Sequence, residues 1–203
     1  EASQLQGIEA LLGWDQETYM PEGAGAARSE QVAYITTLMH SKLVGEPLKN
    51  ALEELIDLQT GELRIMTLSD RETRQLKEIW RDYRQESMLP TEFVTDLAKH
   101  ASVSQQAWVR ARKDNDFAFF EPFLTKMVQL QKEKANYLAV GLTPYDSLLD
   151  QFEPEMTSEK VASLFAEIRA RLVPLIQNIR EVKHRVNGSV LTKEYDVDKQ
   201  WDF

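Results

Sequence analysis

Helical periodicity runs through almost the whole chain and constrains the fold more strongly than any other feature. In one segment after another, apolar residues recur every three or four positions, as they do on the buried face of an α-helix. No convincing run alternates polar and apolar residues in the way that a half-buried strand does. Repeats of fixed period and long linkers are also absent from the sequence. The sequence therefore predicts an all-α fold, a multi-helix array in which residues 1–203 form a single helical region.

Capping residues, prolines and glycines predict the ends of these helices. Ser3 with Gln6, and Ser69 with Glu72, have the spacing of capping boxes. At Thr143 a hydroxyl cap is followed by proline and by an acid three residues after the cap. Proline inside a helix removes a backbone hydrogen bond, so we expect a kink in the last long helix. The first predicted helix ends near residue 21. The later ones cover about 24–44, 47–58, 69–83, 90–114, 117–140, 145–152 and 157–186. The kink is expected at Pro174, and the last helix is expected to end at Asn187.

Large aromatic side chains are expected to contribute to the core. Trp14, Trp80 and Trp108 are core candidates first of all. Four phenylalanines gather where the helix over 117–140 begins, and packing against one another is the first interpretation. A ligand-binding wall or a partner surface is the alternative for this cluster, which consists of Phe117, Phe119, Phe120 and Phe123.

The composition indicates the cellular compartment and argues against two classes of partner. Lys and Arg number 24 against 33 Asp and Glu, which gives a net charge of -9. Nucleic acids and anionic membranes attract proteins through cations, so the acidic balance argues against both as partners. No apolar run approaches the roughly 18 residues that span a bilayer. The absence of cysteine excludes disulfides, thiolate nucleophiles and cysteine-based metal sites, and it suits a reducing compartment. We therefore expect a soluble cytoplasmic protein.

No motif indicates metal or nucleophilic chemistry. A zinc hydrolase commonly places two histidines at i and i+4 of one helix, whereas His40, His100 and His184 fall in three different predicted helices. Surface or partly buried helical histidines are the preferred interpretation, and convergence on a metal is the alternative. Asp146 and Asp150 have the i, i+4 spacing that could support acid–base work or a hard metal ion. Like charges at that spacing more often mark an exposed acidic face.

Three separated blocks carry a more specific signal. The first is Leu-Gly-Trp-Asp-Gln-Glu-Thr-Tyr-Met-Pro at 12–21, followed by a helix with Arg28 and Glu30; the second runs from 108 through Asn-Asp-Phe at 115–117. The third is Pro-Tyr-Asp-Ser-Leu-Leu-Asp-Gln-Phe-Glu-Pro at 144–154. In this order the blocks resemble the signature of the thermostable carboxypeptidase Taq family. One position departs, because Glu155 stands where the family usually has glycine, which adopts a positive φ more readily.

The resemblance implies both an activity and an absence. Members of the family are zinc- or cobalt-dependent metallocarboxypeptidases that act on peptide substrates, and they are often homodimers. This chain looks like their amino-terminal part, so the His-Glu-x-x-His helix and the catalytic glutamate would lie beyond Phe203. No catalytic or metal-binding residue is therefore carried onto this sequence, and no cofactor is expected in this chain. By the same analogy the chain forms one wall of the substrate groove and is inactive by itself.

Four residues are the candidates for facing that groove: Trp14, Asp15, Tyr145 and Asp146. Asp15 and Asp146 also have a structural interpretation, in which they cap neighbouring helices or pair with Arg28. A competing hypothesis from another class is an autonomous helical protein-interaction module without enzymatic activity. Because half of a groove would leave apolar helix faces uncovered, we also expect the isolated chain to self-associate.

Overall fold

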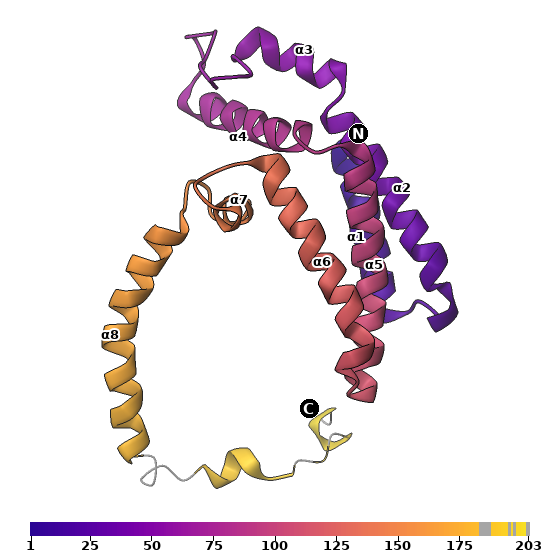
Figure 1. Cartoon of the computed structure of the whole chain (residues 1–203), viewed down its shortest axis with the longest axis vertical. Helices are drawn as coiled ribbons and strands as arrows, with labels where there is room; N and C mark the ends of the chain where they lie inside the picture. The colour runs from indigo at the N-terminus through magenta and orange to yellow at the C-terminus, as the bar shows by residue number, and fades with distance from the viewer. Residues whose placement is uncertain (183–187, 195, 197, 202–203) are drawn as a thin grey trace. The chain divides into compact units, whose positions relative to one another are not determined.

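The computed structural model describes residues 1–182, 188–194, 196 and 198–201, and most of them are helical (Figure 1). In this part of the chain no strand forms, and the only isolated bridge joins Ile56 to Leu63. The all-α prediction is therefore confirmed. The chain divides into two compact units, Glu1–Phe152 and Glu153–Phe203, and each is described by itself. His184 and Asn187 lie outside the described residues, and a single helical region over 1–203 stays a prediction.

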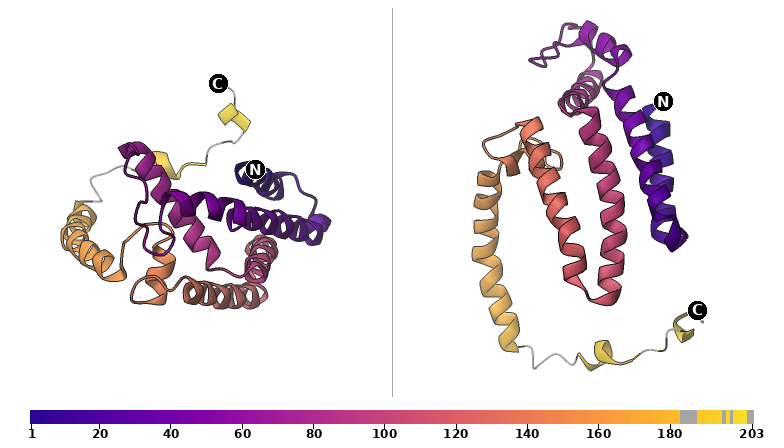
Figure 2. Two further views of the ribbon diagram at one scale, coloured as in Figure 1. Left: turned by 90° about the horizontal axis from the view of Figure 1, so that it is seen from above. Right: turned by 45° about the vertical axis from the view of Figure 1, so that its right-hand side comes forward.

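Four long helices make up most of the first unit. They run lengthwise beside one another in Figures 1 and 2, and they are α1 (Ala2–Thr18), α2 (Gly25–Leu43), α5 (Thr91–Asp114) and α6 (Phe117–Leu138). α5 is the central member, because it packs against both α2 and α6, while α1 packs on α2. A core cluster forms around the α5–α6 pair from Leu89, Phe93, Val94, Leu130 and Leu138.

The turns between these helices use the residues that the sequence marks. Asn115 ends α5 in the left-handed conformation, with φ 54°, which asparagine tolerates better than most residues. The side chain of Asp116 then accepts a hydrogen bond of 3.1 Å from the Phe119 N–H and caps α6. Pro21 leads from α1 into a short 3-10 turn, Glu22–Ala24, before α2 begins. These predicted boundaries are confirmed.

A second core cluster joins α3 (Glu46–Leu55) to α4 (Asp70–Ser87), which lie across one end of the long helices (Figure 1). Its buried members are Leu52, Ile56, Leu76 and Tyr83. Gly61 lies in the connection after α3 with φ 75°, and a Cβ there would come within 2.6 Å of the Trp80 ring. Glycine is therefore required both by the backbone conformation and by the close approach. The capping box of Ser69 and Glu72 forms as predicted and begins α4.

The short helix α7 (Pro144–Leu149) is tied to its neighbours by several hydrogen bonds. The Ser147 hydroxyl accepts from the Val140 N–H at 2.9 Å and donates to the Val140 carbonyl at 2.6 Å. After the helix, Asp150 accepts hydrogen bonds from Arg81 at 2.9 Å and from Gln85 at 3.0 Å, both on α4. These contacts fix the segment against the ends of α6 and α4.

The second unit contains α8 (Ser158–Val182) and two short 3-10 turns, Ser189–Thr192 and Asp198–Trp201. Thr157 begins the helix as predicted, because its hydroxyl accepts the Lys160 N–H at 3.3 Å. Glu155 adopts φ 63°, so the backbone keeps the positive φ that the family's glycine suits. The helix is continuous through Pro174. Whether it is kinked there stays a prediction.

Three detailed expectations are wrong. α1 begins at Ala2 with Glu1 as its N-cap and without a side-chain cap bond, so Ser3 already lies inside the first turn. Trp14 and Trp108 are about half exposed rather than buried, whereas Trp80 packs against the α3–α4 cluster. Periodicity shows which face of a helix is apolar, but it does not show whether another element covers that face.

Candidate functional site

The first signature block forms the end of α1 and the turn into α2. Arg28 on α2 reaches back with a side chain that is only 10% exposed, and its Nη2 donates to Asp15 Oδ2 at 2.5 Å. The same guanidinium donates to the Leu12 carbonyl and, through Nε, to Gln31 Oε1 at 3.1 Å. A buried guanidinium needs such partners for its five N–H groups. Asp15 therefore joins α1 to α2, which is the structural interpretation left open by the sequence.

The third block forms a capping box at α7. Asp146 Oδ2 accepts the N–H groups of Leu142 and Thr143 at 3.2 and 3.0 Å, and the Thr143 hydroxyl accepts the Asp146 N–H at 3.1 Å. The Asp146 residue is only 2% exposed. Asp150, one turn later, is also buried and bonds to α4, so the expectation of an exposed acidic face is wrong. Both carboxylates sit where unsatisfied backbone or guanidinium donors require them.

The two aromatic candidates are the exposed ones. Trp14 is 55% exposed and lies beside Tyr19, with ring centroids 5.5 Å apart. Tyr145 is 60% exposed at the first turn of α7. The structure thus holds the two carboxylates in local bonds on α1 and α7 and presents a ring beside each of them. A groove-facing role for all four residues stays a prediction.

The phenylalanine cluster only partly packs as expected. The rings of Phe119 and Phe123 lie 5.8 Å apart, and the Arg110 guanidinium lies 4.6 Å from the centre of the Phe119 ring. Phe117, however, is largely exposed, so its inclusion in the packing cluster is wrong. The reason is its place at the first position of α6, where no neighbouring helix covers it among the described residues.

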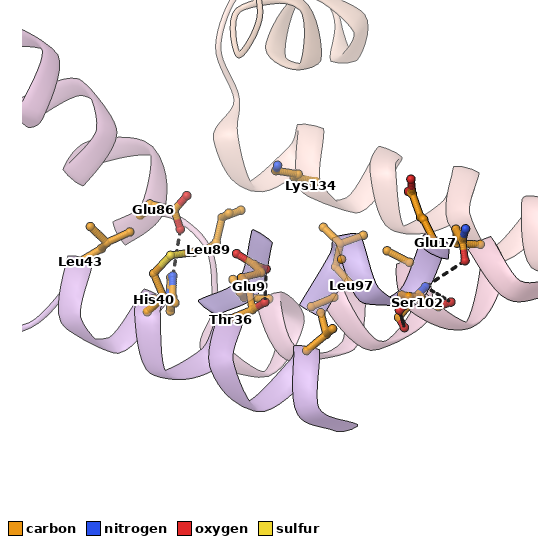
Figure 3. Close-up of a pocket in the computed structure, with 18 residues that line it drawn as sticks. Glu9, Glu17, Thr36, His40, Leu43, Glu86, Leu89, Leu97, Ser102 and Lys134 are labelled. Carbon is orange, nitrogen blue, oxygen red and sulfur yellow. Dashed lines mark hydrogen bonds and ion pairs between the residues drawn. The ribbon is translucent and has the colours of Figure 1, made fainter. Parts of the chain in front are cut away.

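A cavity of about 430 Å³ lies within the first unit, between side chains of α1, α2, α4, α5 and α6 (Figure 3). On one side the His40 Nδ1 lies 3.0 Å from Glu86 Oε2, and the Thr36 hydroxyl donates to Glu9 at 2.7 Å. Lys134 reaches in from α6. The remaining wall is mostly apolar and includes Val32, Met39, Leu89, Val94 and Leu97.

The cavity was not predicted from the sequence, although the position of Lys134 within an apolar stripe could have indicated it. Lys134 occupies the face of α6 that also carries Leu130 and Leu138, one turn before and one turn after it, and both leucines are buried. A lysine in an apolar helical stripe marks a charge drawn away from water. Burial lowers the pKa of Lys134 from its usual value, and the Glu86 carboxylate partly opposes that shift.

The two described histidines are buried, so the expectation of surface or partly buried positions is wrong for them. His40 pairs with Glu86, as above, and His100 Nε2 lies 2.9 Å from the Phe123 carbonyl oxygen. A carbonyl only accepts, so that nitrogen carries the hydrogen, and Ser104 Oγ lies 3.0 Å from it. Among the described residues, no three His, Cys, Asp or Glu side chains gather closely enough to hold a metal ion.

Comparison with known proteins identifies the family. The family model described as "Carboxypeptidase Taq (M32) metallopeptidase" matches residues 1–203. The chain belongs to the carboxypeptidase Taq family. Thermostable carboxypeptidase 1 of Thermus thermophilus is 30% identical over 100% of the chain, and its namesake of Pyrococcus furiosus is 29% identical over 95%. The resemblance carried by the three blocks is confirmed.

Solved structures of similar proteins agree with this family assignment. The structure of Pyrococcus furiosus carboxypeptidase matches with a TM-score of 0.71 at 29% identity, over 89% of this chain. The crystal structure of BsuCP matches with a TM-score of 0.88 over 99% of this chain, and at 24% identity it supports the fold alone.

Length separates this chain from its relatives. It spans only 37 to 41% of the length of the curated carboxypeptidases that it matches, and 35 to 39% of the length of these two solved chains. No helix in the part that the structure describes is both long and apolar enough to cross a membrane.

Proposed function

We propose that this chain is the amino-terminal helical part of a metal-dependent carboxypeptidase that removes residues from peptide carboxy termini. The observation that carries the proposal is the match of a metallopeptidase family model to residues 1–203. The names of the relatives, which are carboxypeptidases, support the same reaction class. No observation favours an autonomous interaction module over this assignment.

The family implies a metal, and the described residues do not fit one. No three potential ligand side chains gather among them, and the two described histidines already bond to protein groups. We propose that zinc or cobalt is held by another part of the full-length protein, and that the 203-residue chain is inactive alone. A bound zinc or cobalt would supply Lewis-acid activation of the substrate carbonyl and of water.

In this proposal the chain supplies one wall of the peptide groove. The exposed rings of Trp14 and Tyr145 are suited to contact a peptide, since each is held by a fixed helix end. Asp15 and Asp146 position those helix ends through Arg28 and the α7 cap. A wall of this kind would contribute shape and the exclusion of water, rather than a reacting group.

Compartment and partners belong to the same proposal. The net charge of -9 and the absence of cysteine support a cytoplasmic protein whose partners are peptides rather than nucleic acid or membranes. We also propose that the full-length protein forms a homodimer, as members of the family often do.

A direct test measures peptidase activity in the full-length protein and in the 203-residue chain. We expect the full-length protein to release the carboxy-terminal residue of an amino-blocked dipeptide, to lose that activity to a chelator, and to regain it with zinc or cobalt. The shorter chain is expected to release nothing under the same conditions. Activity that survives complete metal removal, or activity in the shorter chain, would contradict the proposal.

The groove role is tested with Tyr145→Phe in the full-length protein, because this change removes only a hydroxyl. We expect a lower kcat/KM with an unchanged Tm. Tyr34→Phe is the matched control, since Tyr34 is similarly exposed on α2 and is no groove candidate. Asp15→Asn should lower the Tm by weakening the link to Arg28. If both variants keep full kcat/KM, the hydroxyl has no role, and Tyr145→Ala and Tyr34→Ala then remove the rings. An equal kcat/KM in those two alanine variants would show that the groove role of Tyr145 is wrong.

A further inference from the structure

Lys134 lines the cavity between α1, α2, α4, α5 and α6, and the Glu86 carboxylate acts on its ammonium from beyond ion-pair distance. None of the ion pairs among the described residues includes Lys134. The flanking residues Leu130 and Leu138 are buried in the core, and the lysine between them is half-buried. Holding a cation partly away from water without a direct ion pair is unfavourable, so this position suits an anionic group brought by a ligand.

An acidic side of the same cavity complements the lysine. Three glutamates line it, Glu9, Glu17 and Glu86, and the carboxylates of Glu86 and Glu9 keep acceptor capacity beyond their single bonds to His40 and Thr36. In Figure 3 the Lys134 side chain extends toward the side of the cavity that holds Glu86. The cavity therefore offers acceptors for a cation and a donor for an anion, both on its lining.

The rest of the lining is apolar and of useful size. Leu89, Val94 and Leu97 form one part of the wall, and Val32 and Met39 on α2 form another. A volume of about 430 Å³ lies within the range of small-molecule sites, roughly 300–1,000 Å³. It accommodates a branched aliphatic or aromatic side chain together with a small polar head group.

We propose that this cavity binds a free α-amino acid with an apolar side chain. Its carboxylate would pair with Lys134, its ammonium would bond to the acidic side at Glu86 and Glu9, and its side chain would lie against Leu89, Val94 and Leu97. A simple monocarboxylate would leave the acidic side without a cation, and a simple amine would leave Lys134 without an anion. The zwitterion satisfies both sides at once.

The experiment is calorimetric titration of the metal-free full-length protein with L-leucine. A chelated protein is used so that binding to a metal centre does not contribute, and the readout is independent of peptidase activity. We expect saturable binding, with 4-methylpentanoate and L-leucinamide each binding at least about tenfold more weakly, since each lacks one charged group. L-aspartate, whose side chain is charged, is expected to bind no better than these two.

Two variants locate the site. Lys134→Met keeps the length of the stem and removes the charge, so it should weaken leucine binding about tenfold or more without lowering the Tm. Lys132→Met is the matched control, because Lys132 is exposed on the same helix outside the cavity, and it should bind as the parent protein does. Ala98→Phe, which fills the apolar side, should abolish binding even if Lys134→Met behaves unexpectedly.

Several results would overturn the proposal. They are the absence of leucine binding at millimolar concentration, equal loss in Lys134→Met and Lys132→Met, or unchanged binding in both Lys134→Met and Ala98→Phe. Equal affinity for leucine and 4-methylpentanoate would also overturn it, because the ligand would then be a carboxylate and not an amino acid.

Discussion

α4 and α8 are both amphipathic helices, but only the apolar stripe of α4 is buried. The apolar stripe of α4 is buried through Leu76 and Tyr83, against the cluster that includes Leu52 and Ile56. The stripe of α8 is longer, but none of its described residues is buried, and Leu164 and Ile176 are each over 40% exposed. An apolar stripe thus shows what a helix would bury. It does not show whether a partner is present.

The location of the partner in the chain explains the difference. α3 precedes α4 directly, and the connection between them folds back through Gly61 and the Ile56–Leu63 bridge. Two adjacent helices can therefore cover each other at small cost in loop entropy. In its own unit α8 has only short 3-10 turns beside it among the described residues.

The largest expected effect lies in the α3–α4 cluster. Ile56 is completely buried, so Ile56→Ala should lower the free energy of unfolding by about 2–5 kcal/mol through lost transfer energy and a cavity. Urea denaturation of the 203-residue chain, followed by circular dichroism, measures this. A cost below about 0.5 kcal/mol would show that the cluster does not stabilise the unit, and the comparison would fail.

The next effect comes from the ion pair that ties α4 to the segment after α7. Asp150→Ala leaves Arg81, whose side chain is 25% exposed, without its carboxylate, and should cost about 2–3 kcal/mol. Asp114→Ala is the control, because Asp114 pairs with Arg110 only at 3.8 Å on the surface. It should change stability by less than about 0.5 kcal/mol. Equal costs in the two variants would show that the Arg81–Asp150 ion pair does not help to hold α4 in place.

The cap of α4 should have a smaller effect that depends on pH. Ser69→Ala should cost about 1 kcal/mol at neutral pH. Hydrogen bonds from Ser69 lower the pKa of Glu72 below its usual 4.5, so the folded state favours the ionised carboxylate. The stabilisation from this bond is therefore present above pH 4.5 and is lost as the pH falls through the lowered pKa. Ser69→Ala removes the hydroxyl bond to Glu72 and keeps the bond from the backbone N–H, so unfolding measured from neutral to acidic pH should show a weaker acid dependence in this variant. An unchanged acid dependence would contradict the assignment.

At the start of the second unit, relieving a strained backbone position should increase stability. Glu155 holds a positive φ of 63°, which costs a residue with a Cβ roughly 1 kcal/mol. Glu155→Gly should recover about that amount in thermal unfolding followed by far-UV circular dichroism. Glu155→Ala keeps the Cβ and should gain nothing. If alanine stabilises as much as glycine, the gain comes from losing the side chain rather than from relieving strain.

The smallest effect is expected on α8. Ile176→Ala should change the stability of the 203-residue chain by less than about 0.5 kcal/mol, because the side chain is already exposed. In the full-length protein the same change should cost more if the stripe is covered there. A cost of about 2 kcal/mol in the shorter chain would show that α8 is buried by another copy, as self-association predicts.

Local rules predicted the helix boundaries well because the signals act within one turn. The Ser69 capping box, the Asn115 turn and the Thr143 cap each involve residues three or four positions apart, and all three form. The same rules misplaced the start of α1, where Ser3 has the right spacing but the helix has already begun. They also could not show that Trp14 would be exposed, since exposure depends on distant segments.

In the candidate site, too, some features could be predicted from the sequence and others only from the structure. The sequence singled out Asp15 and Asp146 as carboxylates in specific blocks, and the alternative of pairing with Arg28 or capping a helix was already visible. Only the structure showed that Asp15 takes the first of these roles and Asp146 the second. The cavity at Lys134 could not be predicted, because its lining comes from five helices and is spread from Glu9 to Lys134 along the chain.

The sequence by itself determined that this protein is helical, where most of its helices begin and end, and which family it resembles, because propensities, caps and motifs are encoded locally. Tertiary structure alone decided which apolar stripes are covered. The α4 stripe has a partner in α3, the helix just before it in the chain, whereas no described residue of α8 is buried. Burial is a property of two surfaces, and a single stretch of sequence specifies only one of them.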